Sequence, residues 1–357
     1  MSDSARSDSQ IIFSVPEGTV RIEKRRCYSE NGECTAEIPK KVTSLSLPDS
    51  VTVIGEDAFD GCSSLTTVDL PGSVRKIGDG AFSGCSSLIS VTIPSGVTVI
   101  GDDVFRDCSA LVSVEIPDTV TEIGVLAFFG CSSLVSVDIP NSVRILGVMA
   151  FSGCTSLVSV KIPDSVALIS ICGVFYGCSS LREIRVSPGN KKFRSRDGIL
   201  FGKGTLLVFP AGKDLKHYAI PRYVKEIADG AFCGCILLVS VDIPDSVWVI
   251  GEGAFWGCTS LTSVKIPASV TEIGEDTFRD CSSLESVVIP DSVTEIGEGA
   301  FAGCSSLATI EISYSVTEVG ENAFEGCRSL KTAYLPEDLP VKLHDFPDSP
   351  DVEIIRY

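Results

Sequence analysis

The chain has 357 residues, of which 44% are hydrophobic, so it can build an extensive core. Its formal net charge of −18 argues against nucleic acid or an anionic membrane as the main partner, because their phosphates would repel it. Only two histidines are present, and no run of 18 apolar residues exists that could span a bilayer.

Residues 1–42 are expected to form an N-terminal tail and cap. The first ten residues, MSDSARSDSQ, lack the apolar stretch of a secretory signal. This predicts a cytoplasmic protein, with the cell surface or secretion as the alternative. Cys27 and Cys34 lie where a solenoid must seal its exposed core edge. A disulfide between them is one option in an oxidising compartment, and their redox state stays open.

From residue 43 the sequence repeats. Phenylalanine precedes each repeat cysteine by three residues, and of the ten cysteine intervals eight are 23, one is 24 and one is 57. The long interval must hold an insertion. A fixed period in the twenties is typical of a solenoid, here of eleven units. The repeat cysteines are Cys62, Cys85, Cys108, Cys131, Cys154, Cys178, Cys235, Cys258, Cys281, Cys304 and Cys327.

Each unit predicts a short strand followed by a turn. The segment Leu261–Pro267, LTSVKIP, alternates apolar and polar residues, which favours a strand that buries one face. Pro267 lacks an N–H and ends the ladder. In Pro290–Val293, PDSV, proline presets the backbone and Asp or Ser can bond nearby peptide groups, as turns require.

The rest of the unit predicts a second strand and a helical turn. Ser292–Gly297, SVTEIG, favours a second short strand on the opposite side. Glu298–Gly303, EGAFAG, predicts about one helical turn that ends at Gly303.

The pattern L-x-x-V-x-I-P-x-S-V-x-x-I-G-x-x-A-F-x-G-C-x-S resembles the BspA-like class of leucine-rich repeats over roughly residues 43–336. The resemblance implies an α/β fold: a right-handed, curved, strand-rich solenoid with a parallel concave sheet, short helical turns and one β-hairpin insertion. It also implies a protein that binds other macromolecules, often at the cell surface or in adhesion.

These observations predict one elongated solenoid without a cofactor. Its expected parts are the cap (1–42), repeats 1–6 (43–186), a β-hairpin insert (187–220), repeats 7–11 (221–335) and a C-terminal cap (336–357).

The repeat cysteines are predicted to be buried packing residues. Disulfides, zinc and catalysis fit poorly, because stacked cysteines 23 residues apart have parallel Cα–Cβ vectors, no C-x2-C pairing and eleven equivalent environments. A small buried hydrophobe with a weak S–H donor, beside phenylalanine, fits best.

Outward positions on the concave strands are the candidate binding site for a protein or glycan. The position before the central apolar residue is nearly always Ser or Thr, whereas the position after it varies in charge. Such a face suits either many weak hydrogen bonds to a ligand or simple solvation. The variable positions are Asp69, Thr92, Glu115, Asp138, Lys161, Arg185, Asp242, Lys265, Val288, Glu311 and Tyr334.

The insert is the second candidate site, because residues 187–220 carry seven basic and two acidic residues, a net charge of +5 on a chain of −18. This patch could capture an acidic partner or another copy of the chain, or it could keep exposed strand edges soluble. Its members are Lys191, Lys192, Arg194, Arg196 and Lys203, with Lys213 and Lys216 further on.

No enzyme or metal site is predicted. The sequence has no phosphate-binding glycine loop followed by lysine, no H-E-x-x-H and no G-x-S-x-G. His217 and His344 are expected to be surface residues. A column of acids after the repeat glycine could bind calcium weakly, but solubility and support for the helical turns explain it better. These acids are Glu56, Asp79, Asp102, Glu252, Glu275, Glu298 and Glu321.

Overall fold

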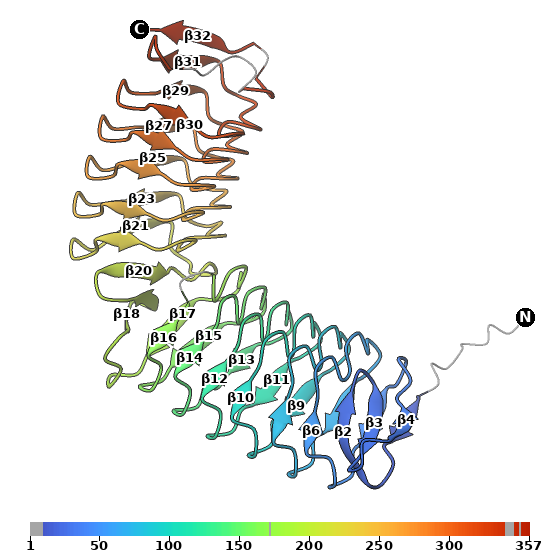
Figure 1. The fold of residues 1–357 in the computed structure, drawn as a ribbon. Helices are drawn as coiled ribbons and strands as arrows, with labels where there is room; N and C mark the ends of the chain where they lie inside the picture. Colours follow the sequence, from blue (N-terminus) through green and yellow to red (C-terminus); the bar gives the residue numbers. More distant parts are fainter. Residues whose placement is uncertain (1–9, 171–172, 340–345, 350) are drawn as a thin grey trace, which may run out of the picture. The chain divides into compact units, whose positions relative to one another are not determined.

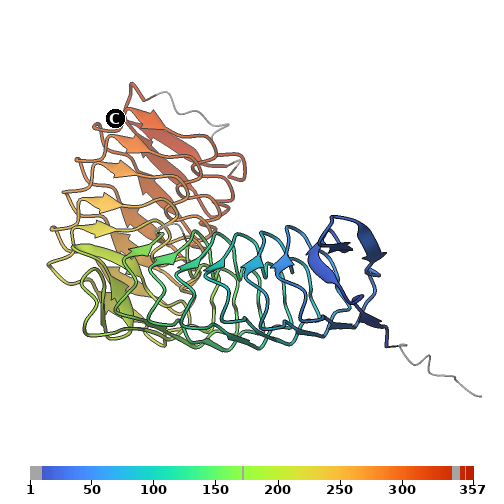
Figure 2. The ribbon, with the colours of Figure 1, turned by 60° about the horizontal axis from the view of Figure 1, so that its bottom comes forward.

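The computed structural model describes residues 10–170, 173–339, 346–349 and 351–357. The chain divides into two compact units, unit 1 (Met1–Ser170) and unit 2 (Ile171–Tyr357). In each unit the chain coils through stacked turns, so that equivalent strands lie side by side (Figures 1 and 2). The described residues contain no helix with the length and hydrophobicity that a membrane span requires.

The first strands of successive turns form short parallel sheets, which we together call the main sheet. Paired strands are parallel, and within the repeats each residue pairs with its equivalent 23 positions away, for example Ser44 with Thr67 and Ser263 with Ser286. At the two ends the spacing differs, because Ile12 pairs with Ser44 and Thr332 pairs with Glu353. In unit 1 the strands are β1 (Ile12–Ser14), β5 (Ser44–Ser46), β7 (Thr67–Asp69), β9 (Ser90–Thr92), β11 (Ser113–Glu115), β13 (Ser136–Val137) and β15 (Ser159–Ile162). In unit 2 they are β17 (Glu183–Val186), β21 (His217–Ala219), β23 (Ser240–Asp242), β25 (Ser263–Lys265), β27 (Ser286–Val288), β29 (Thr309–Glu311), β31 (Thr332–Leu335) and β32 (Glu353–Arg356).

Short second strands pair in the same parallel manner on another side of each unit. In unit 1 they are β2 (Thr19–Glu23), β6 (Val53–Ile54), β8 (Lys76–Ile77), β10 (Val99–Ile100), β12 (Glu122–Ile123), β14 (Ile145–Leu146) and β16 (Leu168–Ile169). In unit 2 they are β20 (Thr205–Val208), β22 (Glu226–Ile227), β24 (Val249–Ile250), β26 (Glu272–Ile273), β28 (Glu295–Ile296) and β30 (Glu318–Val319). The prediction of a strand-rich, parallel solenoid is therefore confirmed.

The predicted helical turns, and with them the α/β class, are wrong for the described residues, which form strands and turns but no helix. The segment Glu298–Gly303 shows why: Gly299 has φ +59° and Gly303 has φ +74°. Two left-handed residues four positions apart interrupt a right-handed helix before one turn is complete. The same pair of positions, two residues before and two after the repeat phenylalanine, has positive φ in all eleven units.

These turns are joined to each other by backbone hydrogen bonds. The N–H groups of Asp57, Phe59 and Gly61 donate to carbonyls of the next turn at 2.7–3.0 Å, and those of Gly80, Phe82 and Gly84 repeat the pattern one turn later. This third ladder satisfies peptide groups that a helix would have satisfied internally.

The repeat phenylalanines stack along the core of each unit. In unit 1, ring centroids from Phe59 to Phe151 lie 5.0–5.5 Å apart with nearly parallel planes. In unit 2 the stack runs from Phe209 to Phe346. Stacked rings at this separation bury large apolar surfaces and add a small aromatic contribution to stability.

The predicted insert contains both a hairpin and material that continues the solenoid. Strand β18 (Arg194–Arg196) pairs antiparallel with β19 (Ile199–Phe201), as expected for a β-hairpin. However, β20 pairs parallel with β22, β21 pairs parallel with β23, and Phe209 lies 5.1 Å from Phe232 in the stack. The residues after the hairpin thus form strands and a core position of the repeat type.

Both ends of the solenoid are covered. At the N-terminal end, β3 (Arg26–Ser29) pairs antiparallel with β2, and β4 (Cys34–Glu37) pairs antiparallel with β3. At the C-terminal end, β32 pairs with β31, and Phe346 lies 5.3 Å from Phe324. Each cap covers apolar surface that the end turn of a repeat array would expose.

A first prediction concerns Leu126, which occupies a left-handed position with φ +55° where most units have glycine or aspartate. Replacing it by glycine (Leu126→Gly) relieves steric strain that costs about 1–2 kcal/mol, partly offset by the greater freedom of glycine in the unfolded chain. We expect the free energy of unfolding in urea to rise by about 0.5–1 kcal/mol.

The matched control is Gly234→Ala. Gly234 has φ +69°, and a Cβ there would meet no atom within 4 Å, so the variant isolates the backbone effect and should lose about 1 kcal/mol of stability. Loss of stability in Leu126→Gly would contradict the strain argument.

Candidate functional site

In each unit the exposed face of the main sheet carries the predicted binding residues at equivalent strand positions, which we call the main-sheet column. In most strands the middle residue is buried and its neighbours are exposed, as in Thr67–Val68–Asp69. All eleven predicted positions, from Asp69 to Tyr334, are exposed. The register places them side by side, for example Thr92 beside Glu115 and Glu311 beside Tyr334. Whether they bind a ligand stays a prediction.

The column is longer than the sequence analysis recognised. Ser46 pairs with Asp69, and Ala219 pairs with Asp242, so both belong to it. Each lies 23 residues before the next member of the column, and this spacing could have identified both from the sequence.

The charged side chains of the column differ in their ion pairs and hydrogen bonds. The Arg185 guanidinium lies 2.6 Å from the Glu183 carboxylate, so its charge is partly neutralised. The Thr92 hydroxyl donates to the Glu115 carboxylate at 3.1 Å. Within the described part of the chain, Lys161 has no ion-pair partner, which leaves its ammonium available for a ligand.

An exposed apolar row in unit 1 was missed by the sequence analysis. Ile89, Val112, Val135 and Val158 are each 41–50% exposed and directly precede the hydroxyl residues of the main sheet. The N–H of Val112 donates to the Ile89 carbonyl at 2.8 Å, and that of Val158 to the Val135 carbonyl at 3.1 Å, so each of these two pairs lies side by side on adjacent turns. We call these four residues the apolar row. Their 23-residue spacing was the available signal.

The five leading basic residues of the insert are exposed on and around the hairpin, whereas Lys213 is half-buried and its Nζ donates to the Asp197 carbonyl at 2.6 Å. Arg194 lies over the ring of Tyr223, 4.4 Å from its centroid, which holds the guanidinium by a cation–π contact. The Arg196 guanidinium is 3.7 Å from the Asp197 carboxylate. Lys191 and Lys192 are exposed in the turn before β18, and Lys203 is exposed in the turn between β19 and β20. Binding by this patch stays a prediction.

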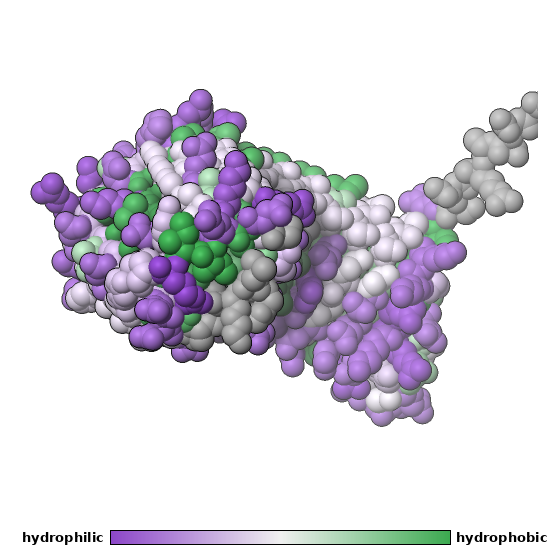
Figure 3. All heavy atoms as spheres, turned by 90° about the horizontal axis from the view of Figure 1, so that it is seen from above, coloured by the Kyte–Doolittle hydropathy of each residue, from purple (hydrophilic) through white to green (hydrophobic). Residues whose placement is uncertain are grey.

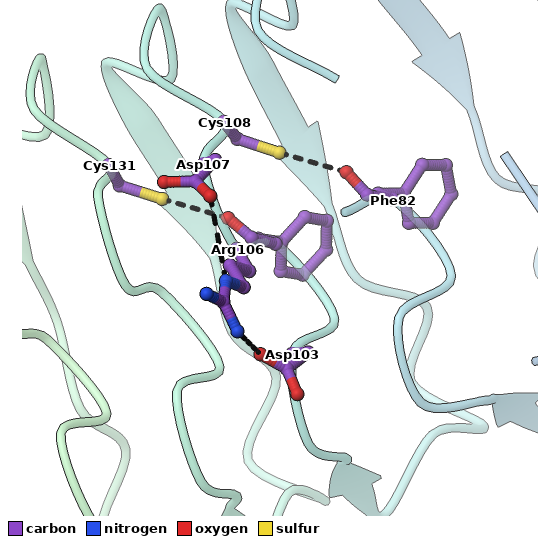
Figure 4. A network of polar contacts seen from close by, with 7 residues as sticks. Phe82, Asp103, Arg106, Asp107, Cys108 and Cys131 are labelled. Carbon is purple, nitrogen blue, oxygen red and sulfur yellow. Dashed lines mark hydrogen bonds and ion pairs between the residues drawn. The ribbon is translucent and has the colours of Figure 1, made fainter. Parts of the chain in front are cut away.

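The repeat cysteines are buried, as predicted for packing residues. Cys108 donates its S–H to the Phe82 carbonyl of the preceding turn at 3.1 Å, and Cys131 donates to the Phe105 carbonyl at 3.1 Å (Figure 4). Equivalent bonds, with S–O distances of 3.1–3.7 Å, are made by Cys85, Cys154, Cys235, Cys258, Cys281, Cys304 and Cys327.

The remaining cysteines differ from the column. Cys27 is buried and Cys34 is exposed, and both are free. Burial, with a smaller contribution from Cys34, raises the pKa of Cys27 to about 11. Cys233 is half-buried, and burial raises its pKa to about 11 as well. Cys172 lies outside the described residues.

Figure 4 also shows ion pairs at two aspartates that have positive φ, Asp103 and Asp107. The Arg106 guanidinium lies 3.2 Å from the Asp103 carboxylate and 3.5 Å from the Asp107 carboxylate. Arg279 contacts Asp276 at 3.0 Å in the same way. Aspartate tolerates positive φ better than most residues. The ion pairs therefore belong to the turn structure.

The acidic column also has a structural use. The Asp79 carboxylate accepts the N–H of Asp102 at 3.0 Å, and the Asp102 carboxylate accepts the N–H of Val125 at 2.7 Å. Each of these aspartates therefore satisfies a peptide N–H one turn further along. The predicted role of supporting helical turns does not apply, because the described residues contain no helix. Among the described residues, no three histidine, cysteine or acidic side chains converge as metal ligands would.

Known sequences and solved structures resemble this chain. A sequence profile described as BspA type Leucine rich repeat region (6 copies) matches residues 37–128, 99–196 and 208–341. No curated protein matches the chain. A leucine-rich cell surface protein from Faecalibacterium prausnitzii is 31% identical, with 87% of this chain and 83% of that chain covered and a TM-score of 0.67.

Two further solved structures are similar. A leucine-rich repeat protein from Bacteroides ovatus is 27% identical over 97% of this chain and 92% of its own, with a TM-score of 0.50. The pneumococcal vaccine antigen PcpA is 21% identical over 97% of this chain and 84% of its own, with a TM-score of 0.70, and this likeness concerns the fold alone.

A second prediction concerns thiol reactivity. Under native conditions a thiol reagent should modify the exposed Cys34 and spare Cys108, Cys131 and the other column members, because their sulfur atoms are buried. Mass spectrometry of tryptic peptides after labelling gives the site occupancy, with the protein in denaturant as the control. Rapid native labelling of the column would contradict the packing role.

A third prediction concerns alkaline stability. Burial raises the pKa of Cys154 to about 12, whereas a thiol in the unfolded chain has a pKa of about 8.5. The folded protein therefore keeps a proton that the unfolded chain releases, and stability falls as the pH rises from about 8.5 to about 12. In Cys154→Ser the hydroxyl can donate to the same carbonyl and does not ionise.

The stability of Cys154→Ser relative to the unsubstituted protein should therefore rise by about 1.4 kcal/mol per pH unit between about pH 9 and 11. Urea unfolding at several pH values measures it. Parallel pH profiles of the two proteins would exclude this linkage.

Proposed function

The chain belongs to the BspA-type leucine-rich repeat family, and from that premise we propose that it is a non-catalytic scaffold that binds a protein or glycan on its main sheet. One observation carries the proposal. In unit 1 each member of the apolar row directly precedes a serine of the main sheet, and two residues further on stands a column position such as Glu115, Asp138 or Lys161. A surface with apolar contact, many hydrogen-bonding groups and varied charge suits recognition of a macromolecule.

The packing argument supports this assignment of the face. Residues that point into a solenoid are fixed by contact with neighbouring turns, so selection for a ligand acts on the outward positions. The outward charge changes sign from Asp138 to Lys161 on neighbouring strands. Variation of this kind sets specificity through charge complementarity.

Cell-surface adhesion is the second form of this proposal. The similar protein from Faecalibacterium prausnitzii is described as a leucine-rich cell surface protein. This supports the surface alternative over the cytoplasmic location that the polar N-terminal residues predict. Immunolabelling of intact cells compared with permeabilised cells tests it, and labelling after permeabilisation alone would favour the cytoplasm.

A fourth prediction tests the main sheet. The purified protein is screened on glycan and protein arrays, and its ligands are titrated against two variants, Lys161→Glu and Val135→Asn. Each variant should weaken binding to the unit 1 face about tenfold, as loss of a central contact does.

The matched control is Glu298→Lys. Glu298 is exposed and belongs to the acidic column rather than to the main sheet, so its charge reversal should leave the affinity unchanged. Equal affinity of all three variants, or no ligand on either array, would contradict the proposal.

A further inference from the structure

The C-terminal part of unit 2 contains a cavity whose lining residues are not members of the main-sheet column. It has a volume of about 360 Å³, within the usual range for ligand sites. Its walls come from the turn after β29, the turn after β31 and the residue after β32. These walls are formed by Tyr314, Val316, Thr317, Pro336–Leu339 and Tyr357. Figure 3 views this end of unit 2 from above and shows hydrophobic atoms among hydrophilic ones.

Tyr314 departs from the repeat. The corresponding turn position holds Asp49, Gly72, Ser95, Asp118, Asn141, Asp164, Arg222, Asp245, Ala268 or Asp291 in other turns, and none is aromatic. The turn itself is retained, because the N–H of Val316 still donates to the Ser313 carbonyl at 3.1 Å. The aromatic ring is 66% exposed, so core packing does not explain it.

A second aromatic ring is fixed beside it. The rings of Tyr314 and Tyr357 lie edge to face, with centroids 4.7 Å apart and an angle of 85°. The Tyr357 hydroxyl donates to the Ile312 carbonyl at 2.8 Å, and its N–H donates to the Leu335 carbonyl at 3.2 Å. The pair therefore forms a preorganised aromatic wall.

The charge around this wall is negative. Glu337 and Asp338 line the cavity, and Glu311 and Asp291 act on the Tyr357 hydroxyl. Burial, and then Glu311, Tyr314 and Asp291, raise the pKa of Tyr357. The nearby Arg356 guanidinium donates to the carbonyls of Pro336, Glu337 and Leu339 at 2.8–3.2 Å, so it holds the cavity wall in place.

We propose that this cavity binds an arginine side chain presented by a basic segment of a partner protein. A guanidinium stacks on aromatic faces more readily than an ammonium does, and its planar donors match carboxylates in bidentate geometry. Two tyrosine rings with carboxylates around them provide both contacts. The site adjoins the C-terminal end of the main-sheet column, to which Glu311 belongs, but the residues that line the cavity are not members of that column. The proposal does not depend on ligand binding along the column.

A fifth prediction uses a fluorescent peptide with one arginine among glycine and serine residues, titrated by anisotropy against the full chain. The same peptide with citrulline, which has the shape of arginine but no charge, should bind at least about tenfold more weakly. Raising the salt concentration should weaken arginine binding, because the carboxylates are partly exposed to solvent.

Two variants test the walls of the cavity. Tyr314→Asn places at this position the residue that Asn141 provides in another turn, so the fold should tolerate it, and binding should weaken about tenfold. Glu337→Gln should weaken binding several-fold. Glu298→Gln, an exposed acid of unit 2 outside the cavity, is the matched control and should have no effect.

Equal binding of the arginine and citrulline peptides, or full affinity in Tyr314→Asn, would overturn the proposal. Competition by a neutral oligosaccharide and not by free arginine amide would assign the cavity to a sugar instead. Concentration-dependent dimers that both Tyr314→Asn and Arg194→Gln abolish would assign it to the hairpin of a second copy. Failure of the main-sheet variants leaves each of these results unaffected.

Discussion

The backbone hydrogen bonds between successive turns are the interaction on which the rest of this structure depends. They run on three sides of each turn: along the main sheet, along the second strands and between the left-handed turns. Turns of equal length keep all three ladders in register, whereas the end turns and the turn after the hairpin pair at other spacings, as Ile12 does with Ser44 and Thr205 with Glu226. The 23-residue period is therefore a consequence of hydrogen bonding, and side chains stack in columns because the backbone does.

Each column solves one local problem that the ladder creates. The phenylalanines fill the interior, where rings at about 5 Å can stack. The cysteines supply a small side chain with a donor for the Phe carbonyl one turn earlier. Glycine and aspartate occupy most of the positive-φ positions on either side of the phenylalanine, with Leu126, Met149 and Asn322 at the others. Asp79 and Asp102 accept N–H groups of the following turn.

The sequence was sufficient to predict the period, the strands, the phenylalanine core and the inert cysteines, because each depends on residue types that recur. A helical turn was wrongly predicted for Glu298–Gly303 because a left-handed glycine such as Gly303 often ends a helix. The sequence did not reveal that Gly299 is left-handed as well. Phe209 was placed in an insertion because no cysteine follows it at the repeat distance, although it lies 23 residues before Phe232.

The candidate sites likewise include features that the sequence predicts and features that it does not. The exposed column of the main sheet followed from alternation, whereas the apolar row required accessible surface as well as spacing. The cavity beside Tyr314 could not be predicted, because it joins the turn after β29 with Tyr357, 43 residues later in the chain. Only the replacement of Pro-Asp by Ser313-Tyr314 marked the place in the sequence.

The thiol column has one consequence for where such a protein can exist. A buried thiol that stays protonated and donates its S–H to a carbonyl does not enter disulfide exchange, since exchange needs an accessible thiolate. The fold is therefore compatible with reducing and oxidising surroundings alike. Its high cysteine content, which in a small secreted domain would indicate a redox environment, carries no such information in this architecture.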